Sequence, residues 1–367
     1  MSKPRLIAFY LPQYHPFKEN DEWWGKGFTE WTNVGRAKPM FRGHVQPKVP
    51  RDLGYYDLRV PETREEQARL AKYAGIEGFC YWHYWFGNGK RLMERPFNEV
   101  LKTGKPNFPF CLGWANHSWA AKNWNTNDVR GHSDRILIEQ QYGGVNDYTL
   151  HFTTMLPAFQ DIRYIKVYNH PLFVIWQPES IPDFREFKET WNRLAIENGL
   201  ESFYFVGFAY GSKKVKEIES LGLDALCVDY MYEAFLSKQN FINIYKRKIL
   251  KFFRIPKPLK LRYSKYVKYC YRKFESSKNN VIPCVVSNFD HSPRSKGAAC
   301  VLIKQTPSMF VNFLKKTISI QSGNDRKCKD IVFIKSWNEW GEGNYLEPDF
   351  EFGDKYIQMM HNLMEEY

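Results

Sequence analysis

The chain has 367 residues, of which 43% are hydrophobic and 25% are charged. This balance is typical of a globular protein with a large core and excludes a disordered or fibrous chain. No apolar run approaches the roughly 18 residues of a membrane-spanning helix, and the net charge of +13 is concentrated in one segment.

Two features of the composition bear on function. Aromatic residues make up 17% of the chain, with 12 Trp and 23 Tyr, and flat rings suit a cleft that binds sugars. The seven cysteines lack metal-like or disulfide-like spacing, so we expect buried free thiols and a reducing compartment. Because no signal-like segment follows Met1, the sequence predicts a cytoplasmic protein. It also predicts that the protein uses no metal and no other cofactor.

Short apolar segments alternate with helix-like ones along the chain. The predicted strands are residues 7–11, 78–82, 110–114, 172–176, 203–208, 225–230, 282–287 and 331–336. The predicted helices are residues 62–74, 91–103, 147–159, 183–198, 306–320 and 354–366. Continuous apolar runs are expected of strands buried on both faces. The order predicts an α/β fold, a (β/α)8 TIM barrel with long βα loops that forms one catalytic domain over residues 1–367. A doubly wound open sheet is the alternative.

One connection, residues 236–278 between the sixth and seventh strands, is too long for a single crossover helix. It holds fourteen Lys or Arg residues and one acid, Glu275, interleaved with aromatic residues. We predict a basic helical insertion that lies on an anionic membrane surface. A helical cover whose rings pack on the barrel wall is the alternative, and nucleic-acid binding is not expected because nothing else in the chain supports it.

The eighth predicted strand runs into WNEWGEGN, which mixes large aromatics, acids and glycines. Glu339 and Glu342 are three residues apart and would face one side of a coiled segment. Two carboxyls about 5–5.5 Å apart are the arrangement of retaining glycoside chemistry. We therefore predict Glu339 and Glu342 as catalytic, flanked by Trp337, Asn338 and Trp340. Two solvated glutamates in a turn are the alternative.

Polar and aromatic residues also follow the other predicted strands, where a barrel places its active site. The predicted substrate-binding residues at strand ends are Tyr10, Gln13, His15, His83, Tyr84, Trp85, Trp114, Asn116, His117, Trp119, Tyr230, Asp290 and Arg294. The long first loop adds Trp23, Trp24, Glu30 and Trp31 as a lid or wall. We expect five tryptophans, Trp23, Trp24, Trp31, Trp85 and Trp119, to ring the mouth in partly buried positions. A small aromatic core under the loop is the alternative.

Several long motifs resemble a known family. They are FYLPQYHP, NDEWWGKGFTEWTNV, LGYYDLR, GFCYWHYWF, FPFCLGWAN, FDHSPR and WNEWGEGNYLEP. Together they resemble the WbsX-type glycosyltransferases of bacterial polysaccharide gene clusters. These are similar in turn to the endo-acting α-mannosidases and α-mannanases of glycoside hydrolase family ninety-nine. The resemblance covers nearly the whole chain.

The resemblance implies a (β/α)8 barrel that acts on glycosidic bonds with retention. Glu339 would match the residue that assists the sugar's own 2-hydroxyl as nucleophile, and Glu342 the general acid/base. Two positions depart from the family pattern. His117 stands where a glutamate is expected, and His291 with Ser292 where Asn-Thr is expected.

The sequence thus predicts a glycosyltransferase or glycoside hydrolase of bacterial surface polysaccharide biosynthesis, such as O-antigen lipopolysaccharide or capsule. Its partner would be an oligosaccharide or lipid-linked glycan, and its location the cytoplasm, peripheral to the inner membrane. A catalytically silent glycan-binding barrel and, less favoured, a nucleic-acid-binding protein are the alternatives.

Overall fold

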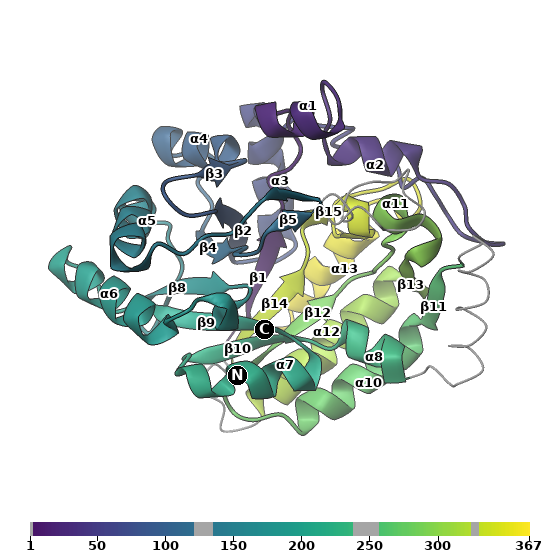
Figure 1. Cartoon of the computed structure of the whole chain (residues 1–367). Coiled ribbons are helices and arrows are strands. Elements are labelled where there is room, and N and C mark those ends of the chain that lie inside the picture. Colours follow the sequence, from purple (N-terminus) through teal and green to yellow (C-terminus); the bar gives the residue numbers. More distant parts are fainter. Residues whose placement is uncertain (1–2, 121–134, 238–256, 324–329) are drawn as a thin grey trace.

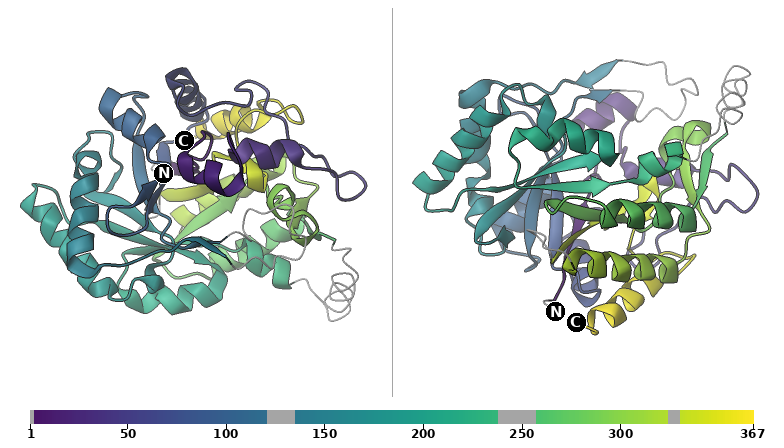
Figure 2. Two further views of the ribbon diagram at one scale, coloured as in Figure 1. Left: turned by 45° about the horizontal axis from the view of Figure 1, so that its top comes forward. Right: turned by 90° about the horizontal axis from the view of Figure 1, so that it is seen from below.

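The computed structural model describes residues 3–120, 135–237, 257–323 and 330–367. Its centre is a closed barrel of eight parallel strands with helices on the outside (Figures 1 and 2). The strands are β1 (Arg5–Tyr10), β2 (Gly78–Trp85), β4 (Phe110–Trp114), β8 (His170–Ile175), β9 (Tyr204–Tyr210), β10 (Ala225–Asp229), β12 (Val281–Val286) and β14 (Ile331–Lys335). All eight predicted strands are present, with ends shifted by a few residues.

The barrel closes because β1 pairs with both its sequence neighbour β2 and the last barrel strand, β14. Ile7 lies opposite Gly78 in one pairing and opposite Phe333 in the other. A doubly wound open sheet would leave two free edges, so this pairing confirms the TIM barrel.

Helices connect successive strands and cover the outside of the barrel, as βα connections require. They are α3 (Pro61–Tyr73), α4 (Arg95–Thr103), α5 (Gly144–Phe159), α6 (Phe184–Glu197), α7 (Gly211–Ile218), α8 (Met231–Ser237), α10 (Tyr263–Glu275), α12 (Pro307–Ser322) and α13 (Lys355–Met364). The predicted helix 91–103 begins only at Arg95. Arg91 and Leu92 instead form β3 (Arg91–Leu92), which pairs with the end of β2, and Pro96 suits the first turn of the helix.

Aromatic rings fill the interior of the barrel. Phe9 stacks on Trp82 with ring centroids 4.7 Å apart and lies 5.2 Å from Phe333. Trp176 stacks on Phe208 at 4.8 Å. These stacked rings fill the barrel interior and form the floor of the space at the C-terminal ends of the strands.

The loops at that end carry small elements of their own. The first loop contains α1 (Lys18–Trp24) and α2 (Glu30–Arg36). Further along are β5 (Trp119–Ala120) with β6 (Ile136–Ile138), and β11 (Leu259–Arg262) with β13 (Cys300–Ile303). η2 (Pro178–Ser180), α11 (Ser292–Ser295) and η4 (Lys296–Ala298) also lie there, whereas β7 (Lys166–Val167) and η3 (Glu219–Leu221) lie at the opposite end, in the connections that lead into β8 and β10.

The described part of the 236–278 insertion ends in α10, which packs on the barrel. Tyr263, Tyr266, Cys270 and Phe274 of this helix are fully buried. The rings of Tyr263 and Tyr266 therefore cannot lie in a lipid headgroup zone, which corrects the prediction for these two residues. The basic run from Lys246 to Arg254 lies outside the described residues. No helix in the described ranges combines the length and apolar character required to cross a bilayer.

Candidate active site

The segment after β14 folds back and brings two glutamates to the mouth of the barrel. Glu339 ends β15 (Asn338–Glu339), and Glu342 ends η5 (Trp340–Glu342). β15 pairs with β16 (Asn344–Tyr345), so the chain returns over the strand ends. The side chains of the two glutamates are 11% and 15% exposed, respectively. They are therefore not the two solvated acids of a simple turn.

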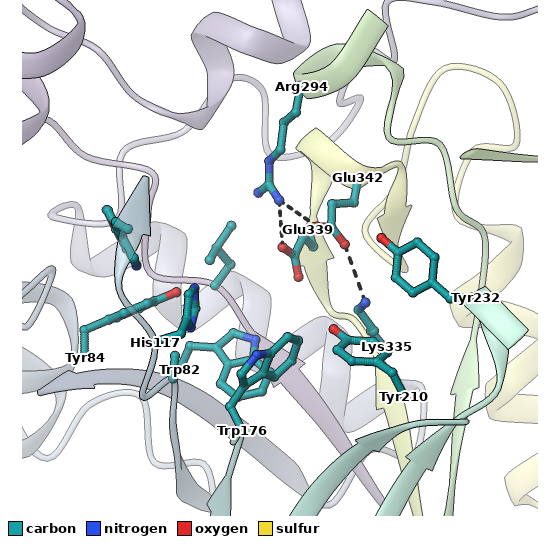
Figure 3. Close-up of a pocket in the computed structure, with 13 residues that line it drawn as sticks. Trp82, Tyr84, His117, Trp176, Tyr210, Tyr232, Arg294, Lys335, Glu339 and Glu342 are labelled. Atoms are coloured by element: carbon teal, nitrogen blue, oxygen red, sulfur yellow. Dashed lines mark hydrogen bonds and ion pairs between the residues drawn. The ribbon is translucent and has the colours of Figure 1, made fainter. Parts of the chain in front are cut away.

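Arg294 of α11 joins three carboxylates at this point (Figure 3 shows two of them). Its Nη1 donates to Glu342 Oε1 at 2.8 Å and to Glu339 Oε1 at 3.3 Å, and its Nε donates to Glu30 Oε1 at 2.9 Å. Because one nitrogen serves both Glu339 and Glu342, the two carboxyls are direct neighbours. Glu30 is fully buried, so it positions Arg294 and does not face a substrate.

Gly341 makes this arrangement sterically possible. A Cβ atom added there would lie 1.7 Å from Glu30 Oε1 and 2.9 Å from Arg294 Nε. Both distances are far shorter than a van der Waals contact. The glycine between the two acids is therefore required by the approach of Glu30 and Arg294.

A lysine at the end of β14 also reaches the acid pair. Lys335 Nζ lies 3.5 Å from Glu342 Oε2 and 3.9 Å from Asp229 Oδ2. Its ammonium also lies 5.3 Å from the centroid of the Tyr210 ring. Burial disfavours the charge of Lys335, but Tyr210, Glu342 and Asp229 together raise its pKa. The lysine therefore faces Glu342 as a cation.

These neighbours separate the protonation of the two glutamates. Burial raises the pKa of Glu339 to about 7, and the negative charge of Glu342 acts in the same direction. Burial also acts to raise the pKa of Glu342, but the positive charges of Lys335 and Arg294 outweigh it and hold that pKa well below its usual range. Below about pH 7 the pair therefore holds one proton, on Glu339.

The pair opens into a cavity of about 300 Å³ with aromatic walls (Figure 3). The lining residues are Leu11, Trp82, Tyr84, Ala115, His117, Trp119, Trp176, Tyr210, Tyr232, Arg294, Lys335, Glu339 and Glu342. Burial lowers the pKa of His117 to about 4, so it faces the cavity as a neutral imidazole. Of the predicted site residues, the structure thus brings together Tyr84, His117, Trp119, Arg294, Glu339 and Glu342.

Strand alternation explains why other predicted residues point elsewhere. On β2, Trp82 and Tyr84 face the cavity, whereas His83 and Trp85 face the surrounding helices. There His83 Nε2 lies 2.8 Å from His151 Nε2, and Trp85 Nε1 donates to Asp147 Oδ1 at 3.2 Å.

The predicted residues that do not line the cavity are Tyr10, Gln13, His15, Trp23, Trp24, Glu30, Trp31, His83, Trp85, Trp114, Asn116, Tyr230, Asp290, Trp337, Asn338 and Trp340. Several support the site from behind. Asn338 holds β15 to the end of β1, because its Nδ2 donates to Leu11 O at 3.0 Å and its Oδ1 accepts from Leu11 N at 2.8 Å. Trp340 Nε1 donates to Glu347 Oε2 at 2.6 Å.

The five tryptophans expected at the mouth have different environments. Trp119 is buried, lines the cavity and packs against the half-buried Trp23 at a centroid distance of 6.0 Å. Trp31 packs on Trp340 at 5.5 Å in a small aromatic core under the first loop. Trp24 is half-buried. The expected partial burial is wrong for Trp119 and for Trp85, which lies in the barrel–helix layer.

Sequence reasoning missed Lys335, Tyr210 and Tyr232, and left Trp82 and Trp176 out of the substrate-binding set. A lysine at the last position of an otherwise apolar strand is itself unusual, since unpaired lysines are almost never buried, and could have marked Lys335. Within the described residues, no group of three or more His, Cys, Asp or Glu side chains is placed to hold a metal ion.

The fold and site define a TIM-barrel chain with a buried acid pair at the C-terminal mouth. The sequence matches the family described as "Glycosyltransferase WbsX" over residues 6–360. This chain belongs to that family, which is a family of glycan-active enzymes.

Two proteins of Xanthomonas campestris pv. campestris, both called "Uncharacterized protein WxcX", are similar to it. They are 34% identical (strain ATCC 33913) and 33% identical (strain B100) over 356 residues. Each match covers 95% of this chain and 48% of the relative. The chain thus spans about half the length of these curated relatives.

Solved structures share the fold at low sequence identity. A "Glycoside hydrolase-like protein" superposes with a TM-score of 0.64 at 14% identity, covering 99% of this chain and 94% of that chain. The GH99 endo-alpha-mannosidase of Bacteroides thetaiotaomicron superposes with a TM-score of 0.56 at 15% identity, covering 99% and 97%. At this identity the likeness concerns the barrel fold alone.

Proposed function

We propose that the chain breaks a glycosidic bond at Glu339 and Glu342 and passes the glycosyl group to an acceptor with retention of configuration. The observation that carries the proposal is the acid pair itself. The two carboxyls share Arg294, are largely removed from water and differ in protonation, inside a cavity with aromatic walls. Glycoside chemistry needs one protonated and one ionised carboxyl at the scissile bond.

We assign the proton donor to Glu339 and the base to Glu342. The raised pKa of Glu339 keeps a proton available for the leaving oxygen. Lys335 and Arg294 keep Glu342 ionised, so it can take a proton from an attacking hydroxyl, such as the sugar's own 2-hydroxyl. The family resemblance implies the reverse assignment. We favour ours because Arg294 Nη1 lies closer to Glu342 (2.8 Å) than to Glu339 (3.3 Å), and Lys335 Nζ lies 3.5 Å from Glu342.

The walls of the cavity suit a sugar ring. Trp82 and Trp176 meet edge to face at 5.0 Å between centroids and present aromatic surface to the cavity. The C–H face of a pyranose can lie on such a surface while its hydroxyls find Tyr84, His117 and Tyr232.

We further propose the biological setting that the family suggests. The substrate would be an oligosaccharide or lipid-linked glycan of a bacterial surface polysaccharide, handled at the cytoplasmic face of the inner membrane. The names of the similar solved structures make α-mannosides the first compounds to try.

The experiment is turnover on a panel of α-mannosides and other defined oligosaccharides in H₂¹⁸O, with product masses measured. Hydrolysis adds one ¹⁸O atom to the product, whereas transfer gives a longer glycan without label. NMR of the first product reports the anomeric configuration, and an inverted product contradicts retention. Binding of the same glycans without any turnover, in wild type and Glu339→Gln alike, would make the chain a glycan-binding barrel.

A further inference from the structure

A second cavity of about 350 Å³ lies beside the acid pair, between the first βα loop and the β11–β13 sheet. Its lining residues are Phe41, Arg42, Gly43, His44, Val45, Lys48, Lys260, Asn288, Asp290, Val301, Leu302, Ile303, Lys304, Gln305 and Glu351. None of the predicted site residues except Asp290 belongs to it.

The charges of this second cavity are unbalanced. Four lining side chains are cationic and two are acidic. Both acids already have partners: Glu351 accepts from Lys48, and Asp290 Oδ2 accepts from Gln46 Nε2 at 2.6 Å and lies 2.7 Å from His44 Nε2. The remaining cations, Arg42, Lys260 and Lys304, form no ion pair with any described residue.

Two of the cavity walls are held in place by packing. The Phe41 ring stacks on His44 with centroids 4.3 Å apart, and Lys260 Nζ lies 4.6 Å from the centroid of Phe41. His44 in turn contacts the buried Asp290. The first loop is therefore anchored to the β12–α11 connection, and the ammonium of Lys260 is positioned over an aromatic face rather than extended freely into solvent.

The second cavity and the acid pair share one short segment of chain. Asn288 and Asp290 line the second cavity, and Arg294 lines the first. The backbone N–H of Asp290 donates to the carbonyl of Glu342 at 2.6 Å. A glycan extending from the acid pair would thus need to cross only this segment to reach the cationic cavity.

We propose that this second cavity binds a phosphate or diphosphate group through Arg42, Lys260 and Lys304. Three cations without acidic partners suit a multiply charged anion better than a neutral sugar. This inference rests on the reaction proposed above. In that reaction the bound anion would be the phosphate of a glycan carrier or of a phosphorylated sugar.

The test uses inorganic pyrophosphate as probe, titrated into the full chain by calorimetry at constant ionic strength. Saturable binding to the wild type is expected. The triple variant Arg42→Gln, Lys260→Gln, Lys304→Gln should weaken it by roughly tenfold or more, because charge-assisted contacts are lost. All three side chains are exposed, so folding should survive.

The matched control removes three exposed lysines on outer helices, with Lys72→Gln, Lys102→Gln and Lys216→Gln. It has the same net charge as the test variant and should bind pyrophosphate like the wild type. Equal weakening in both variants would show only general attraction to a basic protein and would overturn the proposal, as would no binding at all. Lys304→Glu alone, which reverses one charge, should also weaken binding.

Two further arms separate the sources of the anion and the two proposals. A short prenyl diphosphate that binds more tightly than pyrophosphate identifies a lipid carrier, whereas preference for a sugar phosphate identifies a phosphorylated glycan. Glu339→Gln should bind pyrophosphate like the wild type. If it loses turnover while the triple variant binds pyrophosphate normally, the proposed function stands and the cationic cavity does not. If pyrophosphate binding depends on the three cations while turnover survives Glu339→Gln, the cationic cavity stands and the proposed function does not.

Discussion

Arg294 and Lys335 set the chemistry of the acid pair at the scale of single residues. They come from different parts of the chain, yet both place a positive charge within 3.5 Å of Glu342. Glu339 lies farther from Arg294 Nη1, at 3.3 Å, and accepts a hydrogen bond of 3.4 Å from Ser336 Oγ. The difference in environment, and not a difference in residue type, separates the two glutamates.

The proposed roles predict a difference between Glu339→Gln and Glu342→Gln. Both should lower kcat on a natural glycoside, the acid variant by about 10²–10⁴-fold. On a substrate with a dinitrophenolate leaving group, which departs without protonation, only the variant of the proton donor should recover activity. We expect recovery in Glu339→Gln. Recovery in Glu342→Gln alone would show that the assignment implied by the family resemblance is the correct one.

We predict that Lys335→Met shifts the pH profile of kcat/KM. The ammonium favours the ionised form of Glu342, so its loss should raise the pKa of that carboxyl. As the pH is lowered, the variant should lose activity at a higher pH than the wild type, because Glu342 must be ionised. The alkaline limb of the profile still reports Glu339, whose pKa is about 7. The measurement is kcat/KM against pH. Lys213→Met, at a lysine whose side chain is 93% exposed, is the control, and an unchanged acidic limb would exclude this role of Lys335.

At the scale of elements, the segment from β14 to β16 works as one unit with the first βα loop. Asn338 ties it to the end of β1, and Tyr14 donates a hydrogen bond to the carbonyl of Asn338. Glu30 reaches from α2 past Gly341 to Arg294. Glu30, predicted as part of a lid or wall, therefore holds the arginine that the acid pair shares.

Gly341→Ala tests this unit. The added methyl group would overlap Glu30, so Arg294 must move and the protein should lose roughly 1–3 kcal/mol of unfolding free energy, as overpacking does. Chemical denaturation and kcat measure both effects. Gly35→Ala in α2, which meets no atom within 4 Å, should be neutral or slightly stabilising. Equal effects of the two substitutions would remove the steric explanation.

At the scale of the whole molecule, the basic insertion bears on where the protein is located. In the described part of the insertion, α10 buries Tyr263 and Tyr266, leaves Tyr269 and Tyr271 half-buried, and exposes Lys265, Lys268 and Arg272. The aromatic part of the membrane prediction therefore fails for Tyr263 and Tyr266, whereas the cationic part stays a proposal. Each cation near an anionic leaflet contributes about 1 kcal/mol.

Liposome co-sedimentation tests this contact. The wild type should bind vesicles that contain anionic lipid, less so at high salt, and should not bind neutral vesicles. Replacing Lys265, Lys268 and Arg272 by Gln should release it. The control with Lys72, Lys102 and Lys216 replaced should stay bound. Binding to neutral vesicles, or release of both variants alike, would reject a membrane contact through α10.

The sequence by itself determined the barrel and the position of the acid pair. Continuous apolar runs such as residues 331–334 form strands for local reasons, and eight of them alternating with helices leave few other folds. Glu339 and Glu342 could be found because acids directly after a buried strand lie at the C-terminal mouth of a parallel barrel. Both inferences depend on residues that are close together in the chain.

Only the tertiary structure decided which side chains face the cavity and where the proton resides. A shift of one residue along β2 moves a ring from the cavity to the helix layer, so Trp82 faces inward and His83 outward. The pKa difference between Glu339 and Glu342 depends on Arg294 and Lys335, and the cationic cavity depends on the first loop meeting β11 and β13. Coulombic interactions and burial act through space, so residues far apart in the sequence set them together.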